Sequence, residues 1–280
     1  MNKEEIGKMK GVIYMYKFSI IIPNYNEEKS IKKCLDSIFN QTISEERYEV
    51  IVIDDGSNDA SVDIIDQYNV KLLKSNRLGA GGARNKGIDI AKGKYIILLD
   101  GDDYLYKNDV LEKLDKELDN QDIVFVKYKQ ILGEEEKIIE ESSLNSLEEQ
   151  IYKSNHFCCT LKCFKTNLAE SIRYKDKSYH EDISFVMELM CKAKTLLYFN
   201  EILYVYYKKE NKSTIDNYTV RKALDFTKQT LEYLYFADKY KDKKQFLINR
   251  MEQENYSNRL SKLINWVKND KPYTYNEFIE

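Results

Sequence analysis

Apolar and polar residues alternate in blocks along the first half of the chain. Short and nearly continuous apolar runs have the length of strands buried on both faces of a sheet, and they cover residues 17–23, 48–55, 70–75, 95–99 and 122–132. Between these runs, apolar residues recur at the spacing of one helix face, as at Ile31, Cys34, Leu35 and Ile38. The alternation predicts an α/β fold with a doubly wound, mostly parallel, Rossmann-like sheet.

Capping residues suggest where the helices begin. Asn26 stands before two glutamates, Glu27 and Glu28, which predicts an N-cap followed by carboxylates in the first helical turn. Ser57 or Asn58 is expected to cap a second helix over 57–68. A third helix is expected over 81–93, ending on a glycine.

The pattern weakens after residue 133. The segment "GEEEKIIEE" is typical of a solvated loop or an edge hairpin, and 143–154 indicates a weakly amphipathic helix. A helix over 181–193 and two strands, "TLLYF" and "ILYVYY", follow, and beyond about residue 216 only helices are expected. We therefore expect an N-terminal extension (1–16), an α/β domain (17–215) and a C-terminal helical appendage (216–280).

Charge and composition bear on which partners the chain binds. Basic and acidic residues nearly cancel, 44 against 47, so the charge balance does not favour nucleic acid as a partner.

The apolar N-terminal stretch is broken by Lys17, is shorter than the ~20 residues of a membrane span, and lacks a signal-peptide pattern. We expect a cytoplasmic protein whose membrane contact, if any, is peripheral and at the inner face. The tyrosine-rich helical tail fits packing on its own core or against a second subunit, so a homodimer stays open.

Three of the predicted strands end in polar clusters. These clusters are Pro23-Asn24-Tyr25-Asn26, Asp54-Asp55-Gly56-Ser57 and Asp100-Gly101-Asp102-Asp103. In an open parallel sheet they share one rim, which is where ligands bind. Crowded carboxylates repel one another, and a hard cation such as Mn²⁺ or Mg²⁺ relieves the repulsion. Because such ions complete their shell with phosphate oxygens, the clusters predict a site for a metal ion and a diphosphate.

Two further segments are candidates for the site. The glycine-rich stretch "LGAGGARNKGI" has Arg84 where a dinucleotide-binding fingerprint needs its last glycine. It fits a flexible loop at a helix start or a loop that closes over a ligand with Arg84, and both remain open. In "SYHEDISF", Glu181 and Asp182 open a helix. They are either partners of the helix dipole or a general base for an acceptor hydroxyl.

Taken together, the motifs resemble those of family-2 glycosyltransferases with the GT-A fold. The matching stretches are "FSIIIPNYNEEKSIKKCLDSI", "YEVIVIDDGSNDAS", "GGARNKGI", "YIILLDGDD" and "HED", which occur in the family's order between residues 17 and about 215. The resemblance implies that Tyr25 stacks on the nucleotide base and that Asp55 accepts a hydrogen bond from it, as from a uracil N–H. It assigns the remaining nucleotide-sugar contacts to Pro23, Asn24, Asn26, Asp54 and Arg84.

The same resemblance implies the chemistry. Asp100 and Asp102 are the "DxD" pair for Mn²⁺ or Mg²⁺ and ribose, Asp102 being the better metal ligand and Asp103 an auxiliary. Asp182 is implied to be the catalytic base, with Glu181 beside it contacting the acceptor. The implied reaction is a metal-dependent, inverting transfer of one sugar from a UDP-sugar to a hydroxyl of a glycan or lipid-linked acceptor, in surface polysaccharide biosynthesis.

Other interpretations bear on the same residues. The sequence signature of processive members is missing, which favours one sugar per acceptor. A sugar-1-phosphate nucleotidyltransferase needs a glycine-rich loop after the first strand, and "PNYNEEKS" has no glycine. A non-catalytic nucleotide-sugar-binding protein stays open. Lys208 or Lys209 either meets the diphosphate or belongs to a solvated turn.

Overall fold

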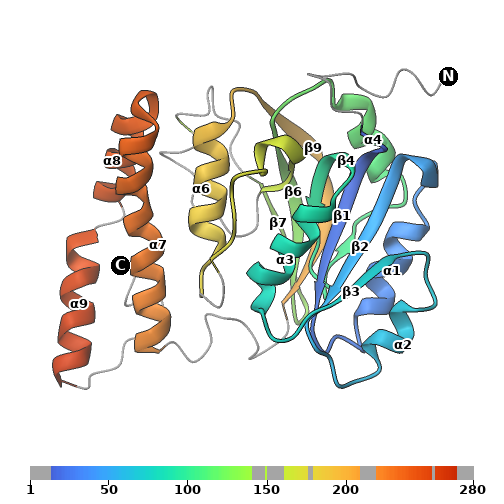
Figure 1. Ribbon diagram of the computed structural model, residues 1–280, viewed down its shortest axis with the longest axis horizontal. Helices are drawn as coiled ribbons and strands as arrows, with labels where there is room; N and C mark the ends of the chain where they lie inside the picture. The colour runs from blue at the N-terminus through green and yellow to red at the C-terminus, as the bar shows by residue number, and fades with distance from the viewer. Residues whose placement is uncertain are drawn as a thin grey trace.

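The computed structural model describes residues 14–140, 149, 161–175, 179–208, 219–253 and 256–269. A nine-stranded sheet lies at the centre of the described chain, in the order β3-β2-β1-β4-β8-β6-β9-β5, with β7 paired to β6 (Figure 1). The predicted helix over 143–154, Lys209 and most of the N-terminal extension lie outside the described residues. Within the described part of the chain, no helix is long and apolar enough to cross a membrane.

The first half of the sheet is parallel, as predicted. Its strands pair in the order β3-β2-β1-β4 and are β1 (Tyr16–Asn24), β2 (Tyr48–Asp54), β3 (Lys71–Lys74) and β4 (Gly93–Leu98). Residues Ile20 to Ile22 of β1 are fully buried because helices cover both faces, which explains the unbroken apolar run. The register pairs Asn24 with Asp54, so β1 and β2 end together.

The second half of the sheet is mixed. Strand β8 (Leu161–Lys165) is antiparallel to both β4 and β6 (Ile123–Leu132), whereas β6 and β9 (Leu196–Lys208) are parallel. A short β5 (Tyr104–Leu105) pairs antiparallel with β9, and β7 (Glu135–Ile139) forms a hairpin with β6. The sequence pattern indicated neither β5 nor β8.

The two strands expected over 195–207 are one strand. Val126 of β6 pairs with Phe199 and Lys127 pairs with Ile202, so Asn200 and Glu201 form an irregularity within β9. A bulge absorbs extra residues without ending a strand. The two polar residues therefore do not separate two strands, and the predicted break was wrong.

Helices cover both faces of the sheet, which confirms the doubly wound class (Figure 1). One hydrophobic cluster joins Ile20 and Ile22 to α1, α2 and α4, and a second joins Ile21 and Ile53 to α3 and α6. The bounds are α1 (Ile31–Phe39), α2 (Ser61–Ile65), α3 (Gly79–Ile90), α4 (Val110–Glu117) and α6 (Asp182–Lys192). Short 3₁₀ turns are η2 (Glu45–Arg47), η3 (Thr166–Leu168) and η4 (Lys241–Lys243).

The first predicted helix cap was wrong. Asn26 has a positive φ of 55° and lies outside α1, which begins at Ile31 after Ser30. Glu27 and Glu28 therefore precede the helix and do not form its first turn. Glu27 instead accepts a hydrogen bond from the Ser30 hydroxyl at 2.6 Å.

The second predicted cap was also wrong, for a related reason. Helix α2 begins at Ser61, several residues after Ser57 and Asn58, and is shorter than the predicted helix over 57–68. The backbone N–H of Asn58 donates to Asn26 Oδ1 at 2.9 Å, and the Ser57 hydroxyl accepts from the Asn26 N–H at 2.9 Å. These polar groups join the first two rim loops to each other.

A glycine fixes how closely α3 lies on the sheet. A Cβ atom on Gly87 would overlap with Ile21 Cγ2 and lie 3.0 Å from Ile53 Cδ1. We predict that Gly87→Ala lowers the free energy of unfolding by about 1–3 kcal/mol, because overpacking outweighs the gain in helix propensity. Denaturant unfolding should show this loss, while Lys86→Ala on the same helix stays within about 0.5 kcal/mol. A neutral Gly87→Ala variant would mean that Ile21 moves aside.

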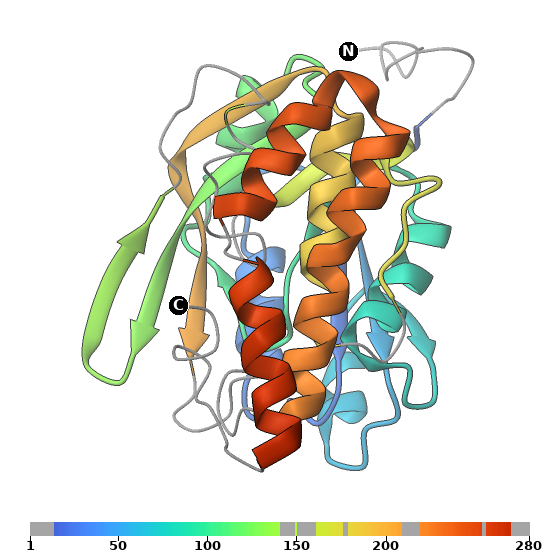
Figure 2. The ribbon, with the colours of Figure 1, turned by 90° about the vertical axis from the view of Figure 1, so that its left-hand side faces the viewer.

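The C-terminal helices form a layer beyond α6 (Figures 1 and 2). They are α7 (Val220–Lys239), α8 (Lys244–Gln253) and α9 (Tyr256–Asn269). Phe226 and Tyr233 of α7 belong to the same buried cluster as Ile21 and Ile53 of the sheet. The described part of the tail therefore packs on the chain's own core.

Candidate active site

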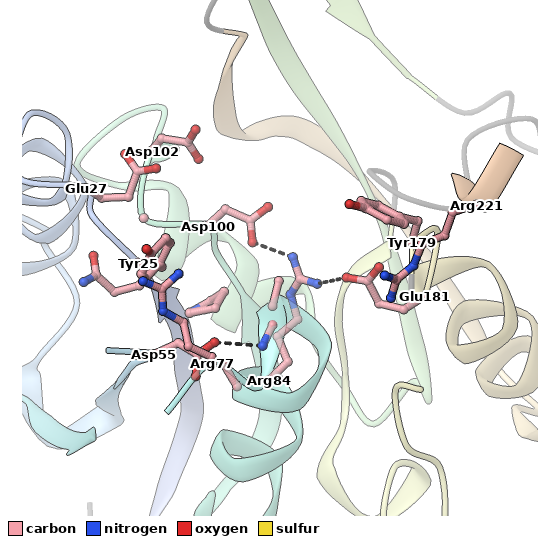
Figure 3. A pocket seen from close by; sticks show the side chains of 16 residues that line it. Tyr25, Glu27, Asp55, Arg77, Arg84, Asp100, Asp102, Tyr179, Glu181 and Arg221 are labelled. Carbon is pink, nitrogen blue, oxygen red and sulfur yellow. Dashed lines mark hydrogen bonds and ion pairs between the residues drawn. The ribbon is translucent and has the colours of Figure 1, made fainter. Parts of the chain in front are cut away.

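A cavity of about 590 Å³ lies at the carboxyl ends of β1, β2 and β4 (Figure 3). Eight of the residues expected from the sequence line it, namely Pro23, Asn24, Tyr25, Asp55, Arg84, Asp100, Asp102 and Glu181. Four other expected residues, Asn26, Asp54, Asp103 and Asp182, are not among its lining residues. The lining also includes four polar residues that sequence reasoning missed as site residues, Glu27, Arg77, Tyr179 and Arg221.

Asp54 does not line the cavity but supports a residue that does, Asn24. Asp54 is buried, and its carboxylate accepts from Asn24 Nδ2 at 2.9 Å and from the Ser57 N–H at 3.1 Å. The Ser57 hydroxyl donates to the same carboxylate at 2.5 Å. These bonds fix the turn after β2 against the end of β1.

Asp55 faces the cavity and holds the start of α3. Its Oδ1 accepts from the Ser75 hydroxyl at 2.7 Å and from the Leu78 N–H at 2.8 Å, and its Oδ2 accepts from the Gly79 N–H at 2.7 Å. A carboxylate at a helix N-terminus is favoured by the helix dipole. Three of its roughly four acceptor positions are used in this way, so its orientation is fixed.

Tyr25 and Arg77 form one end of the cavity. The Tyr25 ring is exposed, and the Arg77 guanidinium carbon lies 4.3 Å from its centroid (Figure 3). Arg77 follows β3, whose carboxyl end is at the same rim as those of β1 and β2. The rule for parallel strands could therefore have predicted Arg77, although no motif marks it.

The acidic cluster after β4 divides between cavity and core. Asp100 and Asp102 line the cavity, whereas the Asp103 side chain is almost fully buried. Asp103 Oδ1 accepts from the Tyr207 N–H at 3.3 Å, which ties this loop to β9. The position of Asp103 is therefore set by the sheet.

Arg84 joins the two acidic parts of the site. It lies within α3 and is 8% exposed, and its Nη2 is 2.8 Å from Asp100 Oδ1. Its Nη1 is 3.4 Å from Glu181 Oε1 and 3.3 Å from Asp182 Oδ1. The expected loop is wrong in both interpretations, because most of the glycine-rich stretch is helical. Arg84 lines the cavity from this helix, and its contact with a ligand stays a prediction.

Gly81 of α3 allows the segment that carries Glu181 to lie close to this helix. A Cβ atom there would lie 2.9 Å from Tyr174 Cβ and 3.0 Å from Glu181 Cγ. The glycine thus brings the chain before α6 against α3, within reach of Arg84.

Burial and charge act together on Glu181. Burial, followed by the neighbouring Asp182, raises the pKa of Glu181 from 4.5 to about 7, and Arg84 opposes this shift. The folded protein therefore binds more protons than the unfolded chain between these two pH values. In this window the contribution of Glu181 to the free energy of unfolding falls as pH rises.

We predict that Glu181→Gln removes this part of the pH dependence. Denaturant unfolding from pH 4.5 to 7 should show that the wild-type protein loses stability relative to the variant as pH rises. Glu134→Gln at the exposed hairpin turn serves as a control and should keep the wild-type slope. Identical slopes in all three proteins would contradict the assignment.

The acidic residues fit a divalent cation that is completed by a ligand. Within the described residues, no group of three or more His, Cys, Asp or Glu side chains is close enough to hold a metal ion. Asp100 and Asp102 nevertheless offer carboxylate oxygens to the cavity, and Mg²⁺ is commonly bound by one or two carboxylates plus phosphate oxygens and water. The residues therefore fit a metal whose remaining ligands come from a bound diphosphate.

Comparison with known proteins identifies the class. The sequence profile described as glycosyl transferase family 2 matches residues 19–170, more than half of the chain. The chain therefore belongs to the family-2 glycosyltransferases, as the motifs indicated. Glu181, Asp182 and Arg221 lie outside the matched region.

The chain matches relatives within this family over very different shares of their length. It is 45% identical over 125 residues to the poly(ribitol-phosphate) beta-glucosyltransferase of Bacillus spizizenii, covering 42% of this chain and 20% of that protein. It is 27% identical over 304 residues to the poly(ribitol-phosphate) beta-N-acetylglucosaminyltransferase TarP of Staphylococcus aureus, covering 91% and 90%. The chain thus spans about a fifth of the length of the first of these relatives.

Solved structures show the same fold. The S. aureus TarS 1-349 structure in complex with UDP-GlcNAc superposes with a TM-score of 0.71 at 24% identity, covering 94% of this chain and 78% of that one. A mannosyltransferase from Pyrobaculum calidifontis, in complex with GDP-Man and Mn²⁺, has a TM-score of 0.60 at 15% identity, covering 91% and 81%. The expected GT-A fold class is confirmed.

Proposed function

We propose that this protein transfers one sugar from a UDP-sugar to a hydroxyl group of a glycan or lipid-linked acceptor, in surface polysaccharide biosynthesis. One observation carries the proposal. A single cavity contains an aromatic ring with a fixed carboxylate at one end and the acidic pair of the β4 loop beside it. Glu181 stands at the other end of the cavity. Glu181 and its neighbour Asp182 both form ion pairs with Arg84. Family membership and relatives that glycosylate poly(ribitol-phosphate) agree with it.

The donor's nucleotide would lie at the end formed by β1 and β2. There Tyr25 offers its ring to the base, and Asp55 accepts from a base N–H with its remaining acceptor capacity. Arg77 lies over the same ring and limits how far the base extends. Pro23 and Asn24 form the adjoining wall.

The proposed metal ion would be Mn²⁺ or Mg²⁺, held by Asp102 and Asp100. When bound, it would supply positive charge to stabilise the departing diphosphate. Arg84 compensates one oxygen of Asp100, which lowers the net negative charge of the acidic pair.

Asp182 is the proposed base. It would take the proton of the acceptor hydroxyl, whose oxygen attacks the anomeric carbon on the side opposite the leaving diphosphate. A single displacement of this kind inverts the anomeric configuration, as in single-step glycoside hydrolysis. Arg84 orients both Asp182 and Glu181, and Glu181 would contact the acceptor.

A thermal-shift screen tests the donor class. We predict that UDP at about 100 times its dissociation constant raises unfolding free energy by about 2.7 kcal/mol, and only when Mn²⁺ or Mg²⁺ is present. ADP, GDP and CDP at the same concentration serve as controls and should have smaller effects.

Assays of sugar transfer then distinguish an enzyme from a non-catalytic nucleotide-sugar-binding protein. UDP release from UDP-GlcNAc or UDP-glucose with a phosphate-bearing polyol as acceptor supports the enzyme. Binding of UDP-sugars without turnover on any acceptor would favour a non-catalytic binding protein, and full activity in EDTA would rule out the metal.

A further inference from the structure

Helix α7 is fixed against the site although it comes from the C-terminal region. The Thr219 hydroxyl caps it by accepting from the Lys222 N–H at 3.3 Å. The Tyr179 N–H donates to Asp225 Oδ2 at 3.2 Å, and Ser184 of α6 is hydrogen bonded to Gln229. The last two contacts hold the N-terminal half of α7 beside the segment that carries Glu181.

Arg221 extends from the first turn of α7 into the cavity. Its guanidinium carbon lies 5.9 Å from the centroid of the Tyr179 ring, and both side chains line the wall near Glu181 (Figure 3). Arg77 and Tyr25 form a similar pair at the other end of the cavity. The site therefore has an arginine beside a tyrosine at each end.

Two arginines of the cavity, Arg84 and Arg221, differ in whether they contact carboxylates. Arg84 contacts three carboxylates, so its charge is compensated within the protein. Across the ranges that the structure describes, Arg221 forms no ion pair with a carboxylate, and the N-terminal end of α7 adds positive potential nearby. Arg221 is exposed where it lines the cavity, and an arginine fork matches the oxygens of a phosphate group.

We propose that Arg221, with Tyr179 beside it, binds a phosphate group of the acceptor, and that the acceptor is therefore a phosphate-bearing polyol or glycan. This inference rests on the proposed function. The donor's own phosphates belong with Asp100 and Asp102, whereas Arg221 lies at the wall that carries Glu181, the neighbour of the proposed base. An acceptor phosphate held there would bring a neighbouring hydroxyl to Asp182.

The test compares two acceptors that differ only in the phosphate, ribitol 5-phosphate and ribitol. With UDP-GlcNAc as donor, Arg221→Gln should raise the KM for ribitol 5-phosphate about tenfold or more. The KM for the donor and the rate of donor hydrolysis by water should stay within about twofold. Arg221→Lys should recover part of the loss. Lys228→Gln, two turns further along α7 and outside the cavity, is the matched control and should behave as wild type.

Three results would overturn the inference. The first is a wild-type enzyme that does not prefer ribitol 5-phosphate to ribitol. The second is an equal loss for both acceptors in Arg221→Gln. The third is a raised KM for UDP-GlcNAc, which would assign Arg221 to the donor's diphosphate.

A binding measurement keeps this test separate from that of the proposed function. Titration calorimetry of ribitol 5-phosphate into UDP-saturated protein needs no turnover. Binding that is lost in Arg221→Gln and kept in Lys228→Gln supports the phosphate site even if no sugar is transferred. Absence of binding to the wild-type protein would refute the site, even if UDP-sugar turnover were observed.

Discussion

Replacing Asp182 with asparagine is expected to lower the rate of sugar transfer by about three orders of magnitude. The amide cannot take a proton from the acceptor hydroxyl, yet it has nearly the size of the carboxylate. UDP binding should remain within about twofold of the wild-type value, because the proposed nucleotide contacts lie at the other end of the cavity. Steady-state transfer rates and UDP titrations measure the two quantities separately.

Glu181→Gln is the informative companion variant. Glu181 and Asp182 lie at nearly equal distances from Arg84 Nη1, 3.4 and 3.3 Å. Each variant therefore replaces one of the carboxylates that contact the same guanidinium group. If only Asp182→Asn abolishes transfer, Asp182 is the base. Full activity in that variant, with loss in Glu181→Gln, would transfer the role to Glu181.

Replacing Arg84 with methionine is expected to reduce the free energy of unfolding by about 3–5 kcal/mol. The change removes a buried cation that contacts Asp100, Glu181 and Asp182, leaving three carboxylates to repel one another. Urea unfolding at pH 7 measures the loss. The loss should shrink at lower pH, where protonation of the carboxylates relieves the repulsion.

Arg47→Met provides the control for this prediction. Arg47 also contacts a carboxylate, Asp115 at 2.7 Å, but its side chain is one-third exposed, so we expect a loss of about 1 kcal/mol or less. Adding Glu181→Gln to Arg84→Met should recover part of the stability. Equal losses in Arg84→Met and Arg47→Met would mean that the cluster around Arg84 is not buried enough to matter.

The sequence predicted the parallel half of the sheet because three of its strands, β1, β2 and β4, are buried on both faces. Their central residues are apolar without interruption, as in Ile20–Ile22 of β1 and Val50–Ile53 of β2, and this pattern needs no tertiary information. Strand β8, "LKCFK", has lysines at two of its five positions, and β5 has only two residues, so neither segment stands out from a loop in the sequence. Their pairing is decided by β4, β6 and β9, which are distant in sequence.

The residues of the candidate site also divide into those that the sequence predicted and those that it did not. Asp55, Asp100 and Asp102 follow buried strands directly, and a parallel sheet must bring such positions to one rim. Arg221 and Tyr179 come from segments whose place depends on how α6 and α7 pack. The helix caps failed because Asn26 and Asn58 bond between loops, a choice that only the folded chain reveals.

Helix α3 contacts both ends of the cavity. Its first turn is bonded to Asp55, and its Arg84 reaches the acids on the far side. A movement of this one helix along its axis would misalign sugar donor and sugar recipient at once. Directed changes to α3 are thus poorly suited to altering one specificity alone. Arg77 and Arg221, carried by separate elements, are better starting points for engineering each specificity independently.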